Sequence, residues 1–312
     1  MTSATISEIR LREELEMNEK FLAFGQFHPL SAFLYLMSVI LVTVFITNPI
    51  AVGISLLGGI LFCAMIQGRK FLSDITFFFA LFVLLSLANP LFSHNGATPL
   101  FFMNGNPVTL EAILYGADIA AVMIAVMIWC KCFSAVMSSD KLICVFGGVL
   151  PKVSLVLTMS LRFLPLFRRK WKELSDAQKA MGYYSEKGFV AKLCVNARIF
   201  SALVTWALEG TAETSSSMKA RGYGLPGRTK FAPFRFTAGD TVLSFCTVAL
   251  IAVSIIGINL GVFTFSFYPR VAKIDFSFVA VCLYATFAAL SLFPFIFETK
   301  EAFRWKYLRS KI

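Results

Sequence analysis

The chain has 312 residues, of which 57% are hydrophobic and 15% charged, and its formal net charge is +11. Soluble domains carry about a quarter charged residues, so this composition excludes an ordinary soluble enzyme or binding module. The 34 phenylalanines suit helix faces that contact acyl chains, and lipid is therefore the expected main solvent.

The chain begins with a polar stretch that is rich in glutamate from Glu8 to Glu19 and lacks the basic n-region and cleavage site of a signal peptide, so the first span is expected to stay as an anchor. No Lys, Arg, Asp or Glu occurs between Lys20 and Arg69, a run too long for one helix of about 20 residues. Asn48-Pro49 interrupts it, because the residue before a proline leaves the helical region. The sequence predicts two spans, at about 30–47 and 50–66, joined by a tight turn.

The third and fourth spans flank a connection at 93–109 that is rich in Gly, Pro and Asn and has no Lys or Arg, which predicts an external loop. Asp118 is the one acidic candidate inside the predicted spans. Such acids can be ion or proton sites, but Asp118 lies about two helical turns from the outer end, and we favour a structural or interfacial role. The remaining spans are predicted at about 75–92, 112–136, 241–265 and 276–297.

Basic residues concentrate at 138–236, which holds 16 Lys or Arg against 6 Asp or Glu. A nucleic-acid surface is one interpretation, but the positive-inside bias of a cytoplasmic loop is favoured. With both termini inside, inner segments hold 26 of the 29 basic residues. We predict an all-α, polytopic helical membrane protein with about six transmembrane helices. Its parts are a cytoplasmic N-terminal segment (1–28), spans one to four (29–137), a basic cytoplasmic domain (138–237), spans five and six (238–298) and a basic cytoplasmic tail (299–312).

The basic domain contains two predicted helices, the first from about 165 to 181, with Pro165 in the first turn, where proline is tolerated. Such a helix suits a membrane surface or a partner protein. The moderately apolar stretch at 153–166 is not predicted to cross the membrane, because basic residues flank it on both sides. The predicted apolar stripe, at three- and four-residue spacing, consists of Phe167, Trp171, Leu174, Ala177 and Met181.

The second predicted helix runs from about 201 to 221, and small residues fill its C-terminal half. Small residues spaced by four let two helix backbones approach closely. Gly222 is well placed to end the helix in a left-handed conformation. A cation near a helix C-terminus is favoured on electrostatic grounds alone. The small neighbours Ala220 and Gly222 would also leave the Arg221 guanidinium clear to contact a partner.

Patterns that carry chemistry are scarce in the sequence. It has no Gly-Lys dipeptide and hence no Walker A loop. His28 and His94 are the two histidines, and they form no metal-binding or catalytic pattern. The seven cysteines include no Cys-x-x-Cys, which favours reduced thiols over disulfides or a zinc site. We therefore expect no enzyme activity, cofactor or metal in this chain.

Several motifs between about Asn89 and Thr229 point to one family. The most specific is Ser-Met-Lys-Ala-Arg-Gly-Tyr-Gly at 217–224, about 50 residues after an Arg-Phe-Leu-Pro segment. Further matching stretches are Asn-Pro-Leu-Phe at 89–92, Thr-Pro-Leu-Phe at 98–101, Thr-Leu-Glu-Ala-Ile-Leu-Tyr-Gly at 109–116, Ser-Asp-Lys at 139–141 and Asp-Ala-Gln at 176–178. On these motifs the chain resembles the transmembrane T component (EcfT type) of energy-coupling factor (ECF) transporters.

The resemblance implies a scaffold in a prokaryotic cell membrane, in which two cytoplasmic coupling helices cross. Each helix would end in an Ala-Arg-Gly motif that docks on one of two ABC-type ATPase subunits, which bind ATP and Mg²⁺. A small membrane S component would capture a vitamin or transition-metal ion, and no nucleic acid is involved. The expected docking residues are Lys179, Ala180, Met181, Gly182, Lys219, Ala220, Arg221 and Gly222, and the expected crossing residues are Gly210, Thr211, Thr214, Ser215 and Met218.

The first coupling helix departs from the family pattern, because it ends Ala180-Met181-Gly182 where the family usually has Arg. Lys179 stands beside Met181, but a lysine lacks the planar fork of arginine. Arg221 is therefore expected to make the dominant polar docking contact. Three rival interpretations are a secondary transporter with internal repeats and broken helices, a lipid-modifying membrane enzyme with clustered Asp, Glu or His, and an ABC permease that binds its own substrate. The T component is favoured over all three.

Overall fold

The computed structural model describes residues 23–311 except 69, 93–95, 104–105, 184–187, 227–233, 235, 269–270 and 273–275. The predicted N-terminal segment therefore lies mostly outside the described residues. The elements are η1 (Phe24–Gln26), α2 (Pro29–Phe45), α3 (Pro49–Gln67), α4 (Lys70–Phe92), β1 (Pro99–Met103), β2 (Asn106–Thr109), α5 (Leu110–Val136), α6 (Ser139–Val149), α7 (Pro151–Ala180), α8 (Phe189–Ala220), α9 (Ala238–Asn259) and α10 (Phe278–Arg309).

The chain forms two compact units. The membrane unit comprises Met1–Leu142 with Phe234–Ile312, and the helix-pair unit comprises Ile143–Pro233. In the described part of the membrane unit, α3, α4, α5, α9 and α10 are long and apolar enough to cross a membrane. The apolar α2 has 17 residues, at the short end of the range for a span. The predicted polytopic helical fold is confirmed.

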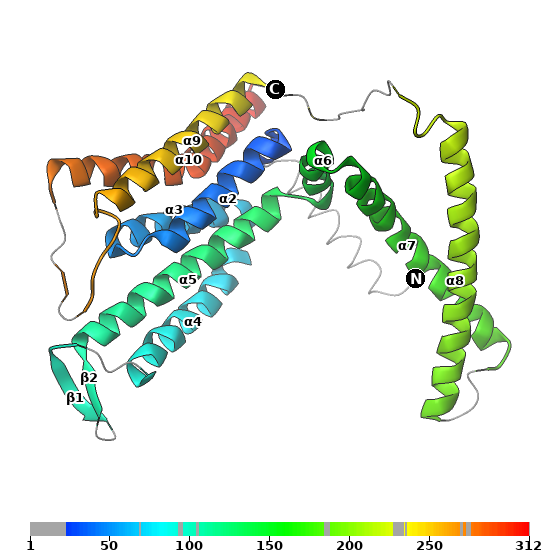
Figure 1. Cartoon of the computed structure of the whole chain (residues 1–312), viewed down its shortest axis with the longest axis horizontal. Helices are drawn as coiled ribbons and strands as arrows, with labels where there is room; N and C mark the ends of the chain where they lie inside the picture. Colours follow the sequence, from blue (N-terminus) through cyan, green and yellow to red (C-terminus); the bar gives the residue numbers. More distant parts are fainter. Residues whose placement is uncertain are drawn as a thin grey trace. The chain divides into compact units, whose positions relative to one another are not determined.

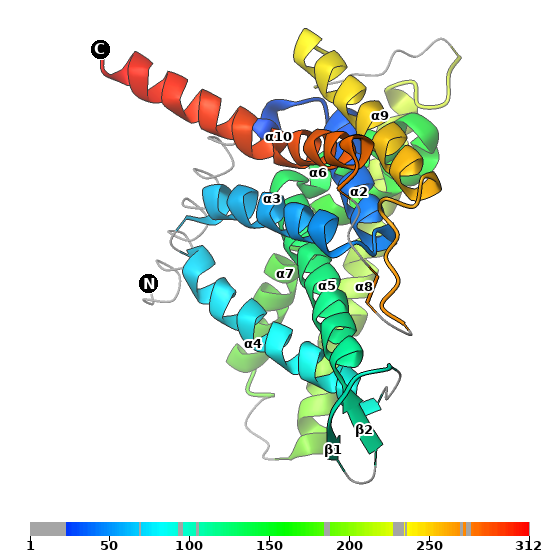
Figure 2. The same cartoon turned by 90° about the vertical axis from the view of Figure 1, so that its left-hand side faces the viewer.

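Within the membrane unit, α5 packs against α2, α3 and α4, while α10 packs on α3 and α9 (Figure 1, Figure 2). Trp129 of α5 is fully buried, and its indole N–H donates to the Ser55 carbonyl oxygen of α3 at 3.2 Å. Gly59 provides the space, because an added Cβ would lie 3.2 Å from the Trp129 indole nitrogen. A small residue opposite a large one lets α3 and α5 approach closely.

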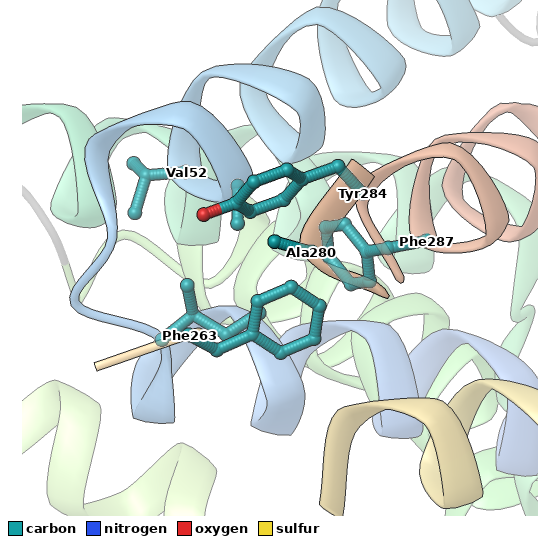
Figure 3. Close-up of a cluster of buried hydrophobic side chains, with 7 residues drawn as sticks. Val52, Phe263, Ala280, Tyr284 and Phe287 are labelled. Carbon is teal, nitrogen blue, oxygen red and sulfur yellow. The ribbon is translucent and has the colours of Figure 1, made fainter. Parts of the chain in front are cut away.

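The predicted break at Asn48-Pro49 joins α2 to α3 and also anchors a buried cluster. Asn48 caps α3, because its side-chain oxygen accepts from the Ile50 N–H at 3.0 Å. Its side-chain nitrogen donates to the Val262 carbonyl and to the Tyr284 hydroxyl, both at 2.8 Å. Beside it, the Phe263 ring lies 5.9 Å from Tyr284 and 5.5 Å from the ring of Phe287, centroid to centroid (Figure 3).

Two buried carboxylates fix the chain at the start of α2. Glu298 of α10 accepts from the Ala23 and Phe24 N–H groups at 3.0 and 2.9 Å. Asp240, in the first turn of α9, forms a capping box with Thr237 and also accepts from the His28 N–H. These bonds connect segments more than 200 residues apart in the sequence. They therefore hold the first and last spans of the membrane unit together.

The predicted loop at 93–109 contains a β-hairpin instead of irregular structure throughout. Strands β1 and β2 pair antiparallel, with Met103 opposite Asn106 and a register irregularity between Pro99 and Phe101. Glu111 ties the hairpin to α5, since its carboxylate accepts from the Thr98 hydroxyl at 2.7 Å. The Asn-Gly pair at 104–105 contributed to the loop prediction but was not used as a hairpin signal, although this dipeptide favours hairpin turns. The pair lies outside the described residues.

Four predicted helix boundaries were wrong. The first coupling helix begins at Pro151 and contains Pro165 in its interior, because the apolar stretch at 153–166 continues the helix. The second begins at Phe189, well before the predicted start near 201. The helix of the last predicted span continues to Arg309, so the predicted tail is helical up to that residue. The helix of the fifth predicted span ends at Asn259, six residues before the predicted end. Of the predicted apolar stripe of α7, Phe167 and Leu174 are half-buried, whereas Trp171, Ala177 and Met181 are exposed.

Candidate functional site

The helix-pair unit is built on α7 and α8, which cross one another (Figure 1). Near the middle of both helices, the ring of Phe167 meets Trp206 edge to face, with centroids 6.0 Å apart. Phe163 stacks on Phe167 at 5.9 Å, and the Lys170 Nζ lies 5.9 Å from the centroid of the Trp206 ring. Aromatic pairs of this kind contribute about 0.5–1.5 kcal/mol beyond the area they bury. This cluster therefore joins the two helices at their crossing.

The predicted crossing residues divide between two faces of α8. Gly210, Thr214 and Met218 are half-buried, whereas Thr211 and Ser215 are exposed. A Cβ added at Gly210 would meet no atom within 4 Å outside its own helix backbone. Close backbone approach at Gly210 is therefore not a feature of the described helix pair. The crossing role of these five residues stays a prediction, and the described contact between the helices is the aromatic one at Trp206.

The C-terminus of α7 is closed by a Schellman motif around Gly182. The Gly182 N–H donates to the Lys179 carbonyl at 3.0 Å, and the Tyr183 N–H donates to the Gln178 carbonyl at 3.2 Å. Gly182 has φ +81°, a left-handed conformation that glycine adopts without a Cβ penalty. The motif fixes the backbone at Met181, the residue immediately after the helix, and leaves the Met181 side chain exposed.

The C-terminus of α8 has the same cap. The Gly222 N–H donates to the Lys219 carbonyl, and the Tyr223 N–H donates to the Met218 carbonyl, both at 3.0 Å. Gly222 has φ +79°, nearly the value found at Gly182. The two helix ends therefore present the residue before the glycine in the same backbone setting. That residue is Met181 on α7 and Arg221 on α8, and both are exposed.

The sequence around these caps is repeated. Residues 179–183 read Lys-Ala-Met-Gly-Tyr and residues 219–223 read Lys-Ala-Arg-Gly-Tyr, so one position in five differs. The sequence analysis named both lysines and both Ala-x-Gly motifs but did not note that a tyrosine follows each glycine. The tyrosine supplies the N–H that closes each cap, and its ring is about half exposed at both ends. A search for short internal repeats would have found this signal.

Charge differs between the two ends. Arg221 is exposed at the end of α8, where a cation is favoured by the helix dipole. At the end of α7, Lys179 forms an ion pair with Asp176 at 3.3 Å, and both side chains are 57% exposed. An exposed pair of this kind contributes about 0–1 kcal/mol. Lys179 therefore has a carboxylate neighbour on its own helix that partly offsets its charge.

A second cation reaches the end of α7 from α8. The guanidinium carbon of Arg198 lies 4.4 Å from the centroid of the Tyr183 ring, within the range of a cation–π contact. Arg198 is exposed, and Tyr183 is two residues from Met181. The structure therefore places a guanidinium beside the helix end whose own motif lacks arginine. Sequence reasoning missed this residue, because only the fold brings Arg198 to Tyr183.

Other motif residues from the sequence analysis have structural contacts in the membrane unit. The Asn89 side chain of α4 donates to the Ala112 carbonyl of α5 at 3.2 Å. A Cβ added at Gly116 would lie 2.8 Å from the Ser86 carbonyl oxygen and 2.9 Å from the Asn89 Cβ. Gly116 is therefore required for the close approach of α4 and α5. Among the described residues, no three His, Cys, Asp or Glu side chains are grouped to hold a metal ion.

Comparisons with known proteins agree with the motifs. The model of a family described as CbiQ, cobalt transport protein, matches residues 26–231, about two thirds of the chain. A relative from Exiguobacterium sibiricum, named energy-coupling factor transporter transmembrane protein EcfT, is 32% identical over 101 residues, covering 32% of this chain and 38% of its own length. Proteins with the EcfT name from Lactobacillus helveticus and Listeria monocytogenes are each 27% identical, over 31% and 33% of this chain and 36% and 40% of their own lengths. The aligned region thus spans less than half of each relative.

Proposed function

We propose a function for this chain from the family to which it belongs, the CbiQ cobalt transport proteins. The chain would act as the transmembrane scaffold, or T component, of an ECF-type ABC importer. It would transmit the ATP-driven motion of two ATPase subunits to a small substrate-binding S component for uptake of a vitamin or a transition-metal ion. ATP and Mg²⁺ would bind to the ATPases. The chain would lie in the cell membrane of a prokaryote with both termini in the cytoplasm.

The observation that supports this proposal most strongly is the pair of matching helix ends. Schellman caps at Gly182 and Gly222 hold Met181 and Arg221 exposed in the same backbone setting. Two equivalent ends suit two related partners, because each partner can meet the same backbone shape. The exposed Arg221 suits a carboxylate on an ATPase, since its guanidinium makes two parallel charge-assisted hydrogen bonds.

The helix pair also has the stiffness that force transmission requires. α8 has 32 residues, so its length is about 48 Å at 1.5 Å per residue. The end of α7 lies beside Arg198 of α8, whose guanidinium contacts Tyr183, so the two docking ends lie apart by roughly 33 Å, the rise of the helix from Arg198 to Ala220. The aromatic contact at Phe167 and Trp206 joins the helices between those ends. Movement of either ATPase would therefore displace both helices together.

We further propose that Arg198 supplies the docking cation at the α7 end. It lies over Tyr183, beside the position where Met181 replaces the family's arginine. The α7 end would then present an apolar Met181 side chain and a neighbouring guanidinium, whereas the α8 end presents both the cap and the cation from one segment. Two different ATPase subunits would suit this asymmetry.

The test is co-purification of the tagged chain in mild detergent, combined with an uptake assay in cells that express the complete transporter. Arg221→Ala is expected to reduce the affinity for one ATPase by about 10- to 150-fold, since a charge-assisted hydrogen bond contributes about 1.5–3 kcal/mol. Arg304→Ala is the matched control, because Arg304 is an exposed arginine of α10 that pairs with Glu301. ATPase binding and uptake at normal levels in Arg221→Ala would contradict the proposed docking role.

A further inference from the structure

A cavity of about 390 Å³ lies in the membrane unit between the start of α3, the first turns of α5 and the connection after α9. Pockets of this size bind small organic molecules. Its walls include Pro49, Gly53, Leu114, Phe265 and Phe267. All described lining residues except one are apolar. The exception is Asp118 of α5.

Asp118 is 8% exposed. In the part of the chain that the structure describes, no group donates a hydrogen bond to its carboxylate and no cation forms an ion pair with it. The structural or interfacial role that the sequence analysis favoured for Asp118 stays a prediction. Burying an unpaired carboxylate is strongly unfavourable, so an ionised Asp118 needs a cation or hydrogen-bond donor in the cavity.

The lining identifies the chemical class of this cation. Divalent metal ions need several oxygen, nitrogen or sulfur ligands, whereas the described walls offer one carboxylate among hydrocarbon groups. A primary ammonium on an apolar body fits both features, because the ammonium pairs with Asp118 and the body contacts Leu114, Phe265 and Phe267. An anion would be repelled by the carboxylate, and a neutral hydrogen-bond donor would leave the buried negative charge without a counter-ion.

The depth of Asp118 agrees with an amphiphilic ligand. Asp118 is eight residues into α5, which begins at Leu110 beside the hairpin, so it lies about 12 Å along the helix axis from that end. With 27 residues, α5 is about 40 Å long, whereas the hydrocarbon core of a bilayer is about 30 Å thick. The carboxylate is therefore within about two turns of the membrane interface, where amphiphiles place their charged groups.

We propose that this cavity is a binding site for a small primary ammonium carried on an apolar body, with Asp118 as its counter-ion. Two sources share this chemistry, a free alkylamine and the ethanolamine headgroup of a phospholipid. The site is independent of the helix ends that carry the proposed docking function. Variants in the cavity are accordingly expected to leave ATPase binding unchanged.

The experiment titrates n-hexylammonium into the purified full-length chain in nanodiscs of phosphatidylcholine and phosphatidylglycerol, with n-hexanol as the uncharged control. We expect saturable binding of the ammonium, at least tenfold tighter than that of the alcohol. Asp118→Asn keeps the size of the side chain and should weaken ammonium binding at least tenfold. Equal affinity for the two probes, or unchanged ammonium binding in Asp118→Asn, would overturn the proposal.

A second variant tests the cavity without removing the charge. Gly53 lines it, and an added Cβ there would meet no atom within 4 Å, so Gly53→Leu should fill the space without displacing a neighbour. Loss of ammonium binding with an unchanged unfolding midpoint is expected. Retained binding in this variant would show that the ammonium binds elsewhere and would overturn the proposal.

Two further experiments identify the source of the ammonium and test whether a basic residue of the chain itself competes for Asp118. Phosphatidylethanolamine in the nanodiscs should compete with n-hexylammonium if the natural source is lipid, whereas its failure to compete would assign the site to a free amine. Arg270 and Lys273 belong to the connection that contributes to the cavity but lie outside the described residues. Ammonium binding that appears only in the Arg270→Ala/Lys273→Ala variant would make Asp118 an internal ion-pair partner and overturn the proposal.

Discussion

Replacing Arg198 by alanine should weaken ATPase binding at the α7 end and leave binding at the α8 end unchanged. The guanidinium carbon of Arg198 lies 4.4 Å from the ring centroid of Tyr183, and both side chains are exposed. Loss of an exposed cation–π contact costs about 0.5–1 kcal/mol of folding stability. Loss of a charge-assisted hydrogen bond to a partner carboxylate would remove about 1.5–3 kcal/mol of binding free energy. The binding loss should therefore exceed the stability loss.

The assay is equilibrium binding of each purified ATPase subunit to the full-length chain in detergent. Arg198→Ala should weaken binding at one end by about 10- to 150-fold, while the thermal unfolding midpoint moves by only a few degrees. The ATPase affinity of Arg198→Lys should lie between that of the unsubstituted chain and that of Arg198→Ala, because lysine keeps the charge but not the planar fork. Met181→Arg in the Arg198→Ala background should regain most of the affinity, since it restores a guanidinium at the α7 cap.

Two results would refute this reasoning. Unchanged affinity for both ATPases in Arg198→Ala would show that the α7 end docks through apolar contacts of Met181 alone. Failure of Met181→Arg to restore affinity in that variant would show that Arg198 acts by holding Tyr183 and not as a contact cation. Arg304→Ala is the matched control, because it removes an exposed arginine of the membrane unit.

Two further predictions concern the helix pair. Gly222→Ala should lower ATPase affinity and local stability, because an alanine at φ +79° costs about 1–2 kcal/mol and its Cβ would lie 3.1 Å from the Leu225 Cδ1. Gly182→Ala isolates the backbone penalty, because Gly182 has φ +81° and an added Cβ there meets no atom within 4 Å. Binding titrations in which Gly182→Ala loses clearly more affinity than Gly222→Ala would contradict the cap argument. Trp206→Ala should leave the binding of both ATPases within about threefold, because both caps remain. It should lower uptake at least tenfold at equal ATP hydrolysis, because the helices lose an aromatic contact worth about 0.5–1.5 kcal/mol. Uptake in proportion to ATP hydrolysis would show that this contact does not transmit motion.

Much of the fold was predictable, because lipid imposes long apolar helices whose ends are marked by charge and proline. The break at Asn48-Pro49 illustrates this, since proline geometry fixes the start of α3 whatever surrounds it. The predicted helix boundaries were wrong where a local sequence rule allowed more than one position for the start of a helix. Pro165 was placed in a first helical turn, but the preceding residues continue the helix and Pro151 occupies that position instead.

The candidate site was predictable where it is local and not where it depends on the fold. The Schellman cap at Gly222 follows from a glycine after an Ala-Arg pair, and the structure gives it the expected left-handed backbone. The cation–π contact of Arg198 with Tyr183 joins two helices, so no spacing rule predicts it. Asp118 was recognised as an intramembrane acid, but its cavity is formed by three segments far apart in the sequence.

The two proposed docking ends differ in how many parts of the chain must come together to form them. At the α8 end, Arg221 and its cap come from six consecutive residues, 218–223, so this end needs no residue from another helix. At the α7 end, the cation comes from Arg198 of the other helix, so it is present only while α7 and α8 keep their relative position. An ATPase that binds at α7 would thereby favour the packed helix pair, because separation of the helices removes part of its docking surface. The departure from arginine at Met181 would then couple docking at one end to the geometry that carries the motion.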